Sequence, residues 1–261
     1  MRSINDYIPT LICDIVTVYI LISLYKTAIK EGRTLQMILF AFATAGLLLS
    51  GLYWLAYDLL YPMQRMPFAA NEMAEWAMFL SLATILSSIH TTSYRSAKWE
   101  IVFAVIFTAA NVALWIAWSG EWMQDIVTGI MLGYFYINLV RIAKETGAFP
   151  RPVWIALGLL CVVIIAANVA TFHVSEAMAS VFDTAAYILL SIVELYFMIR
   201  SILSLYKKED PKTCICLSFI VTAWSFTYMY MSAGMFYNMA NLGMSISFLL
   251  MYFSLKREVT S

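Results

Sequence analysis

The sequence predicts an all-α, polytopic integral membrane protein of nine transmembrane helices, with its N-terminus outside and its C-terminus in the cytoplasm. Three observations predict this fold. Hydrophobic residues make up 62% of the 261 residues and charged residues only 12%, whereas soluble domains have roughly 45–50% and about 25%. The apolar residues form long continuous runs. The basic residues gather between alternate runs.

Each predicted span is a run of about 20 mostly apolar residues, the length at which a helix crosses the hydrocarbon layer. Helices are favoured over a barrel because the runs are continuously apolar, and because backbone groups in lipid must be paired within each segment. The predicted spans cover residues 7–25, 37–60, 73–93, 101–118, 123–142, 153–172, 178–205, 213–231 and 236–255.

The first run is expected to be a retained helix, since no small-residue cleavage site follows a short apolar core. The segments between runs are short, so residues 1–261 are expected to form a single transmembrane domain without a soluble domain. The partner predicted for such a chain is the lipid bilayer. The formal net charge of zero gives no indication of nucleic-acid binding, and no nucleic-acid partner is expected.

The basic residues predict the orientation of the bundle. If nine spans are counted, all 16 Lys and Arg residues except Arg2 and Arg65 fall on one side. Loops rich in Lys and Arg stay in the cytoplasm, so this side is predicted to be the inner one.

Acidic residues within the spans are candidates for function, because ionisable groups are costly in a bilayer. Asp58, Glu75 and Asp125 lie near the outer ends of the predicted spans, and no Lys or Arg in a span core could neutralise them. Two interpretations remain open for these three: they line an outward-facing site, or they reach the headgroup layer from the helix ends.

The seventh predicted span carries a polar stripe. Glu176, Asp183 and Tyr187 recur there at spacings of three or four, together with Ser180, Ser191 and Glu194, so all share one helix face. Hydrogen bonding between helices explains the Ser and Tyr members. The acids favour a polar interior, with Asp183 directed into the protein and continuous with Glu176 and Tyr187.

Aromatic and amide residues complete the predicted pocket. Asn111, Trp115, Trp54 and Tyr228 lie in the outer halves of their spans. Aromatic walls with carboxylates suit a small cationic or amphipathic ligand, through cation–π contact and ion pairing. Tryptophan is also enriched at membrane interfaces, and this is the preferred interpretation of Trp118 and Trp122.

Motifs for catalysis or for metal binding are lacking in the sequence. His90 and His173 are isolated from other ligand residues. Cys214 and Cys216 are interpreted as structural, as small buried hydrophobes. No cofactor is expected, and no residue set argues for an enzyme.

Two segments resemble a known kind of membrane module. They are residues 241–258, which end in Lys256-Arg257-Glu258, and the stretch Gly51-Leu52-Tyr53-Trp54-Leu55-Ala56-Tyr57-Asp58. Both resemble the multi-pass sensor regions that precede signalling domains, such as diguanylate cyclases, in Gram-positive gut bacteria. The resemblance implies a sensor in the bacterial inner membrane whose pocket opens outward. It also implies a cytoplasmic signalling domain or partner, which residues 1–261 are not expected to include.

Two functions therefore compete. In the first, the chain is a sensor or receptor-like module in which a small ligand shifts the helix arrangement. In the alternative, it is a small-solute or cation- or proton-coupled transporter, for which broken helices would be typical. The spans lack interior prolines, which favours the sensor.

Overall fold

The computed structural model describes residues 7–31, 34–61, 70–89, 98–120, 122–232 and 234–260. Within these ranges the fold is all-α, as predicted, and has nine helices and no strand. The helices are α1 (Ile8–Glu31), α2 (Leu35–Leu60), α3 (Ala70–Ile89), α4 (Lys98–Ser119), α5 (Trp122–Glu145), α6 (Arg151–Thr171), α7 (Glu176–Tyr206), α8 (Pro211–Met231) and α9 (Gly234–Thr260).

Each predicted span corresponds to one helix, and the chain is a membrane-embedded helical bundle. Seven described helices, α1, α2 and α5 to α9, are long and apolar enough to cross a membrane. Within α4, the apolar stretch among the fully described residues is Ile101–Ala117, and α3 carries Glu72 and Glu75 in its first two turns. For α3 and α4, crossing of the membrane remains a prediction.

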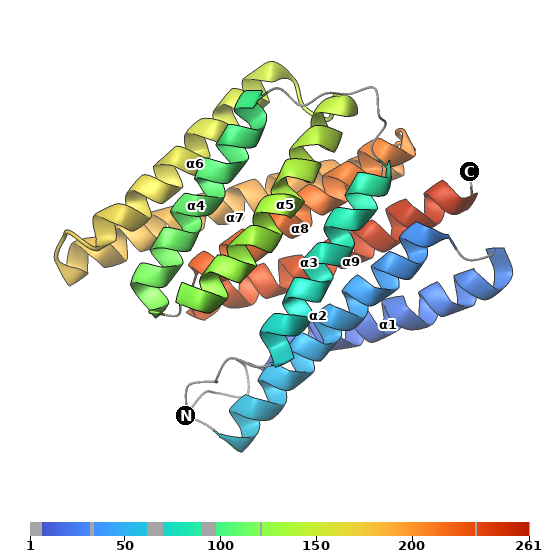
Figure 1. Cartoon of the computed structure of the whole chain (residues 1–261), viewed down its shortest axis with the longest axis horizontal. Helices are drawn as coiled ribbons and strands as arrows, with labels where there is room; N and C mark the ends of the chain where they lie inside the picture. The colour runs from blue at the N-terminus through green and yellow to red at the C-terminus, as the bar shows by residue number, and fades with distance from the viewer. Residues whose placement is uncertain are drawn as a thin grey trace.

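Consecutive helices run in opposite directions, so their ends gather at two ends of the bundle (Figure 1). Every Lys and Arg that the structure describes lies toward the end where α1, α5, α7 and α9 finish and α4, α6 and α8 begin. We call this the basic end. Arg2, Arg33, Arg65 and Arg95 lie outside the described residues, as does His90.

The centre of the bundle is the pair α8 and α9. The membrane-length window of α8 is 72% buried and that of α9 is 67% buried, against 6% for α6, which lies at the edge. α8 packs on α9, α7 and α5, whereas α9 also packs on α1. Thr222 Oγ1 of α8 donates a hydrogen bond to Ser247 Oγ of α9 at 3.1 Å, which ties the central pair together.

Most buried hydroxyl groups bond within their own helix. Thr17, Thr44 and Ser218, for example, donate to carbonyl oxygens three or four residues earlier. This pairing lets Ser and Thr sit in an apolar bundle without an unpaired donor. Hydroxyl groups that reach across to another helix are therefore the informative ones.

Candidate ligand-binding site

A small cavity lies between α1, α2, α3, α8 and α9, toward the end opposite the basic end. Its volume is about 60 Å³. A cavity needs roughly 10–15 Å³ of space open to a water-sized sphere to hold one water molecule, so this cavity has room for a few waters or one small cation. Its walls are formed by Thr10, Cys13, Asp14, Leu47, Ser50, Gly51, Trp54, Asn71, Glu75, Met78, Phe226, Met229, Tyr237, Asn241 and Met244.

Two acidic residues, Asp14 and Glu75, line this cavity, and we call it the acidic cavity. Among the residues that the structure describes, its lining contains no Lys, Arg or His. In a low-dielectric interior, a buried carboxylate needs an opposite charge, or it must hold a proton. The acidic cavity therefore matches a cation or a proton in charge.

Glu75 is held in place by two hydroxyl groups from neighbouring helices. Ser50 Oγ of α2 donates to Glu75 Oε1 at 2.7 Å. The Tyr230 hydroxyl of α8 donates to Oε2 at 3.2 Å. Both carboxyl oxygens thus accept hydrogen bonds, which fixes the orientation of the group.

Asp14 is less completely bonded. Its side chain is buried, yet Oδ2 has no hydrogen-bond partner among the described residues. Asn71 of α3 also lines the cavity, and its Oδ1 likewise has no hydrogen-bond partner among the described residues. Buried polar atoms are nearly always satisfied, so each exception needs an explanation. A bound cation could satisfy such acceptor oxygens in the lining of one cavity.

The rim of the acidic cavity is aromatic and polar. The rings of Trp54 and Tyr7 lie 6.3 Å apart, and the Tyr7 hydroxyl donates to Asp58 Oδ2 at 2.7 Å. On the α9 side, Asn241 Nδ2 donates to Thr10 Oγ1 at 3.2 Å. Asp58 thus lies beside the cavity without lining it.

Three other predicted residues, Asn111, Trp115 and Asp125, lie behind the cavity on α4 and α5. The Trp115 ring contacts Tyr230 at 4.9 Å between centroids, and Tyr230 in turn bonds Glu75. Asn111 is buried and donates to its own helix, at Phe107 O. Asp125 is buried in the first turn of α5.

The predicted stripe on α7 does not reach the acidic cavity. Glu176 is exposed, and Asp183 is half-buried. The Tyr187 ring packs against Phe236 at 5.2 Å, which places it on the opposite side of α8 and α9. Tyr228 is fully buried there, with its hydroxyl 2.5 Å from Ser191 Oγ.

Glu194 is the buried acid of the α7 stripe. Ser225 Oγ of α8 donates to Glu194 Oε1 at 2.5 Å. Gly243 of α9 lies so close to this carboxyl group that a Cβ there would overlap it. The next residue, Met244, lines the acidic cavity. Two adjacent residues of α9 therefore face two acidic groups: Gly243 faces Glu194, and Met244 faces the acidic cavity.

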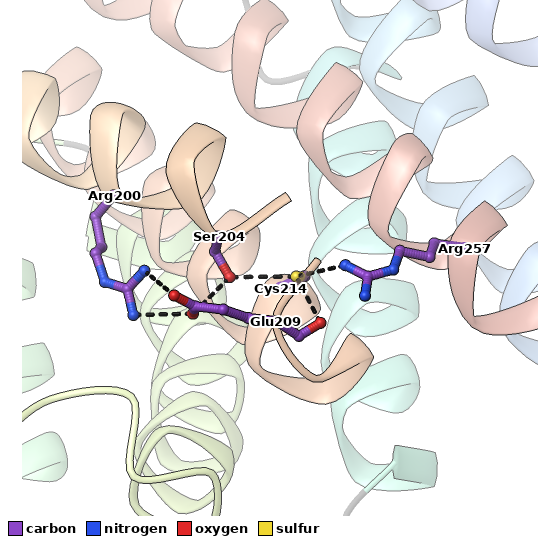
Figure 2. Close-up of polar contacts among 5 residues, drawn as sticks. All are labelled: Arg200, Ser204, Glu209, Cys214 and Arg257. Atoms are coloured by element: carbon purple, nitrogen blue, oxygen red, sulfur yellow. Dashed lines mark hydrogen bonds and ion pairs between the residues drawn. The ribbon is translucent and has the colours of Figure 1, made fainter. Parts of the chain in front are cut away.

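A second polar network lies at the basic end and joins α7, α8 and α9 (Figure 2). Arg200 forms a bidentate pair with Glu209, both N–O distances being 2.9 Å. Ser204 Oγ donates to Glu209 Oε2 at 2.9 Å and lies 3.2 Å from Cys214 Sγ. Arg257 of α9 donates to the same sulfur at 3.6 Å.

Glu209 lies in the turn between α7 and α8, outside the spanning helices. Hydrogen bonds from Arg200 and then from Ser204 hold the pKa of its carboxyl below the usual range. Asp210 follows and caps α8 by accepting from Lys212 N and Thr213 N. The turn is thus fixed on both sides.

Sequence reasoning selected Trp54 and Glu75 from the cavity but missed the partners that define it. Asp14 lies within the first predicted span, 7–25, but is not among the predicted site residues. Ser50, Tyr230 and Asn71 carry no signal of their own. Gly51 does carry a signal in the sequence, because a glycine within an apolar helix suggests that a neighbouring group approaches closely.

Comparison with models of protein families, with curated proteins and with solved structures finds no match to this chain.

Proposed function

We propose that this chain is a membrane-embedded sensor that binds a small cation in the acidic cavity. The observation that carries the proposal is the buried Asp14 oxygen, which has no partner in the described part of the chain. It lies in a cavity that Asp14 shares with Glu75 and with no described basic residue. Binding of a cation would supply the missing charge and the missing contact. A volume of about 60 Å³ favours a small ion over a larger amphipathic molecule.

The sensor interpretation rests on α9, because this helix contributes both to the acidic cavity and to the polar network at the basic end. Tyr237, Asn241 and Met244 of α9 contribute to the acidic cavity. Arg257, near the other end of the same helix, bonds Cys214 in the network of the basic end. A ligand that binds one arrangement of α9 more tightly would shift the population toward it. A cytoplasmic signalling partner would read that shift at the basic end.

The test uses the purified protein in an uncharged detergent. Its melting temperature is followed as Na⁺ or tetramethylammonium replaces a large cation that cannot enter, at constant ionic strength. A ligand that binds only the folded state stabilises it by about 2.7 kcal/mol at a hundred times its Kd. Asp14→Asn should remove this stabilisation, while Glu176→Gln, a change of an exposed acid, should retain it. Equal stabilisation of both variants would contradict the proposal.

A second candidate function is cation- or proton-coupled transport. Glu194 favours it, because this buried acid lies farther along α7 from Glu176 than Asp183 does. It also contacts Gly243 of α9, and the next residue, Met244, lines the acidic cavity. Two acids along one route are typical of proton or ion pathways. Vesicles with the reconstituted protein distinguish the two functions, since only a transporter would carry the bound ion or a proton across the bilayer.

A further inference from the structure

An apolar crevice opens on the other flank of the bundle, toward the basic end. It lies between α4, α5, α6, α7 and α8 and shares no residue with the acidic cavity. Its volume is about 230 Å³. Trp99, Phe103 and Phe107 of α4 face Trp154 and Gly158 of α6 across it. It is therefore a lateral opening beside α6, whose membrane-length window is only 6% buried.

The depth of the crevice matches one half of a bilayer. The α4 stretch from Trp99 to Phe107 rises about 12 Å, at about 1.5 Å per residue. The distance from the interface to the bilayer midplane is roughly 15 Å, half the hydrocarbon thickness. Measured along α4, the crevice thus extends from the basic end over most of this distance.

The deep end of the crevice offers nothing to a polar ligand. Its hydroxyl groups, from Tyr136 and Thr227, bond each other at 2.6 Å. Since these groups already bond each other, a polar ligand would gain no hydrogen bond from them. A hydrocarbon chain could lie beside them without leaving either hydroxyl group unpaired. The remaining walls are largely aromatic or aliphatic.

The mouth of the crevice is positively charged. Lys144 lines it, with its Nζ 3.9 Å from the centroid of the Trp99 ring and 5.8 Å from that of Trp154. Lys98 precedes Trp99, and Arg151 lies one turn before Trp154. Lysine and tryptophan at this depth are typical of the headgroup layer. An anionic headgroup would complement this mouth.

We infer that the crevice binds one acyl chain of an anionic glycerophospholipid from the leaflet at the basic end, with its headgroup beside Lys144. The charge at the mouth, the apolar walls and the depth of half a bilayer all favour this occupant. The inference does not depend on the acidic cavity or on its proposed ligand.

Gly158 offers a way to close the crevice. An added Cβ at Gly158 would meet no atom within 4 Å, so a larger side chain would enter open space rather than displace a neighbour. Gly158→Leu should therefore fill the crevice and leave the fold intact. Ala156→Leu is the matched control, because Ala156 is on the same helix but is exposed and does not line the crevice.

The test incubates the full chain, in an uncharged detergent, with equal amounts of phosphatidylglycerol and phosphatidylcholine of identical acyl chains. Retained lipid is counted by native mass spectrometry. The wild type and Ala156→Leu should keep one phosphatidylglycerol in several-fold preference over phosphatidylcholine. Gly158→Leu should lose most of this retention. Lys144→Gln should still retain lipid but lose most of the preference.

A second measurement covers the case in which the Lys144 variant fails to fold. Phosphatidylglycerol brominated in mid-chain should quench the tryptophan fluorescence of the wild type more strongly than that of Gly158→Leu, because Trp99, Trp154 and Trp224 line the crevice. Equal quenching or equal retention by the wild type and Gly158→Leu would overturn the inference. So would an equal loss in Ala156→Leu.

Discussion

Gly51 on α2 lies directly against the carboxyl group of Asp14 on α1. A Cβ at position 51 would overlap Asp14 Oδ1 and would come within 3.3 Å of its Cγ. Both residues line the acidic cavity. The absence of a side chain at Gly51 therefore allows the acid to be buried between the two helices.

Gly51→Ala should destabilise the protein and weaken cation binding together. Overpacking costs about 1–3 kcal/mol, and alanine recovers only about 1 kcal/mol of helix propensity. Gly158→Ala is the control, since it gains the same propensity in open space and should stabilise by about 0.5–1 kcal/mol. Thermal unfolding measures both. The same sign of change in the two variants would contradict the close approach.

Ser225→Ala should be costly because it leaves the buried Glu194 carboxyl without its donor. The bond of 2.5 Å joins α7 to α8, and loss of a buried partner costs about 1–3 kcal/mol. Ser218→Ala, on the same buried helix, removes a hydroxyl that donates only to Ile215 O of its own helix, so it should cost less. Chemical or thermal unfolding of the two variants ranks these costs, and a reversed order would exclude the proposed role of Ser225.

The pair of Arg200 and Glu209 predicts a pH dependence. Because the pKa of Glu209 is lower in the folded state, its pair contributes stability above the unfolded value of about 4.3. That stability is lost as the pH falls through the folded value. The side chains are 30% and 29% exposed, so the contribution should be at most about 1 kcal/mol.

Melting temperatures of the wild type and Glu209→Gln, measured from pH 7 down to pH 3, test this dependence. The wild type should be the more stable at pH 7, and the difference should shrink in acid. Glu176→Gln, which changes an exposed acid at the opposite end, should show no such trend. A difference that persists unchanged at pH 3 would mean that the carboxylate charge is not responsible.

The positions of the helices could be predicted from the sequence because membrane thickness fixes the length of an apolar run. The prediction of 178–205 corresponds to α7, Glu176–Tyr206. Differences occur where helices continue past the apolar run. α1 extends to Glu31, beyond the predicted 25, because its last turns, with Lys26 and Lys30, keep their backbone hydrogen bonds outside the lipid.

The acidic cavity could not be predicted in the same way, because it depends on which helices are neighbours. The spacing of Glu176, Asp183 and Glu194 shows that they share a face of α7 but not what that face touches or how deep each residue lies. In the structure Glu176 is exposed and Glu194 is buried. The meeting of Asp14 with Glu75 depends on how α1, α2 and α3 pack.

The topology of the chain is testable with reporters that are active in only one compartment. From the basic residues we predict that fusions after Arg65, Lys98, Glu121 and Lys208 report outside, inside, outside and inside. The first two fusions bracket α3, and the second and third bracket α4, the two described helices that are not among the seven long and apolar enough to cross a membrane. An unchanged side across either helix would remove it from the count of spans.

The last prediction separates the two acidic regions of the bundle. Glu75→Gln keeps the shape of the side chain but removes the charge from the acidic cavity, where Ser50 and Tyr230 hold the carboxyl group. Asp183→Asn makes the matching change on α7, at a half-buried residue that does not line the cavity. If a cation binds in the cavity, only Glu75→Gln should lose the rise in melting temperature with Na⁺ or tetramethylammonium. If the stripe on α7 is the site, the order reverses, because Asp183 rather than Glu75 would then carry the charge that attracts the cation.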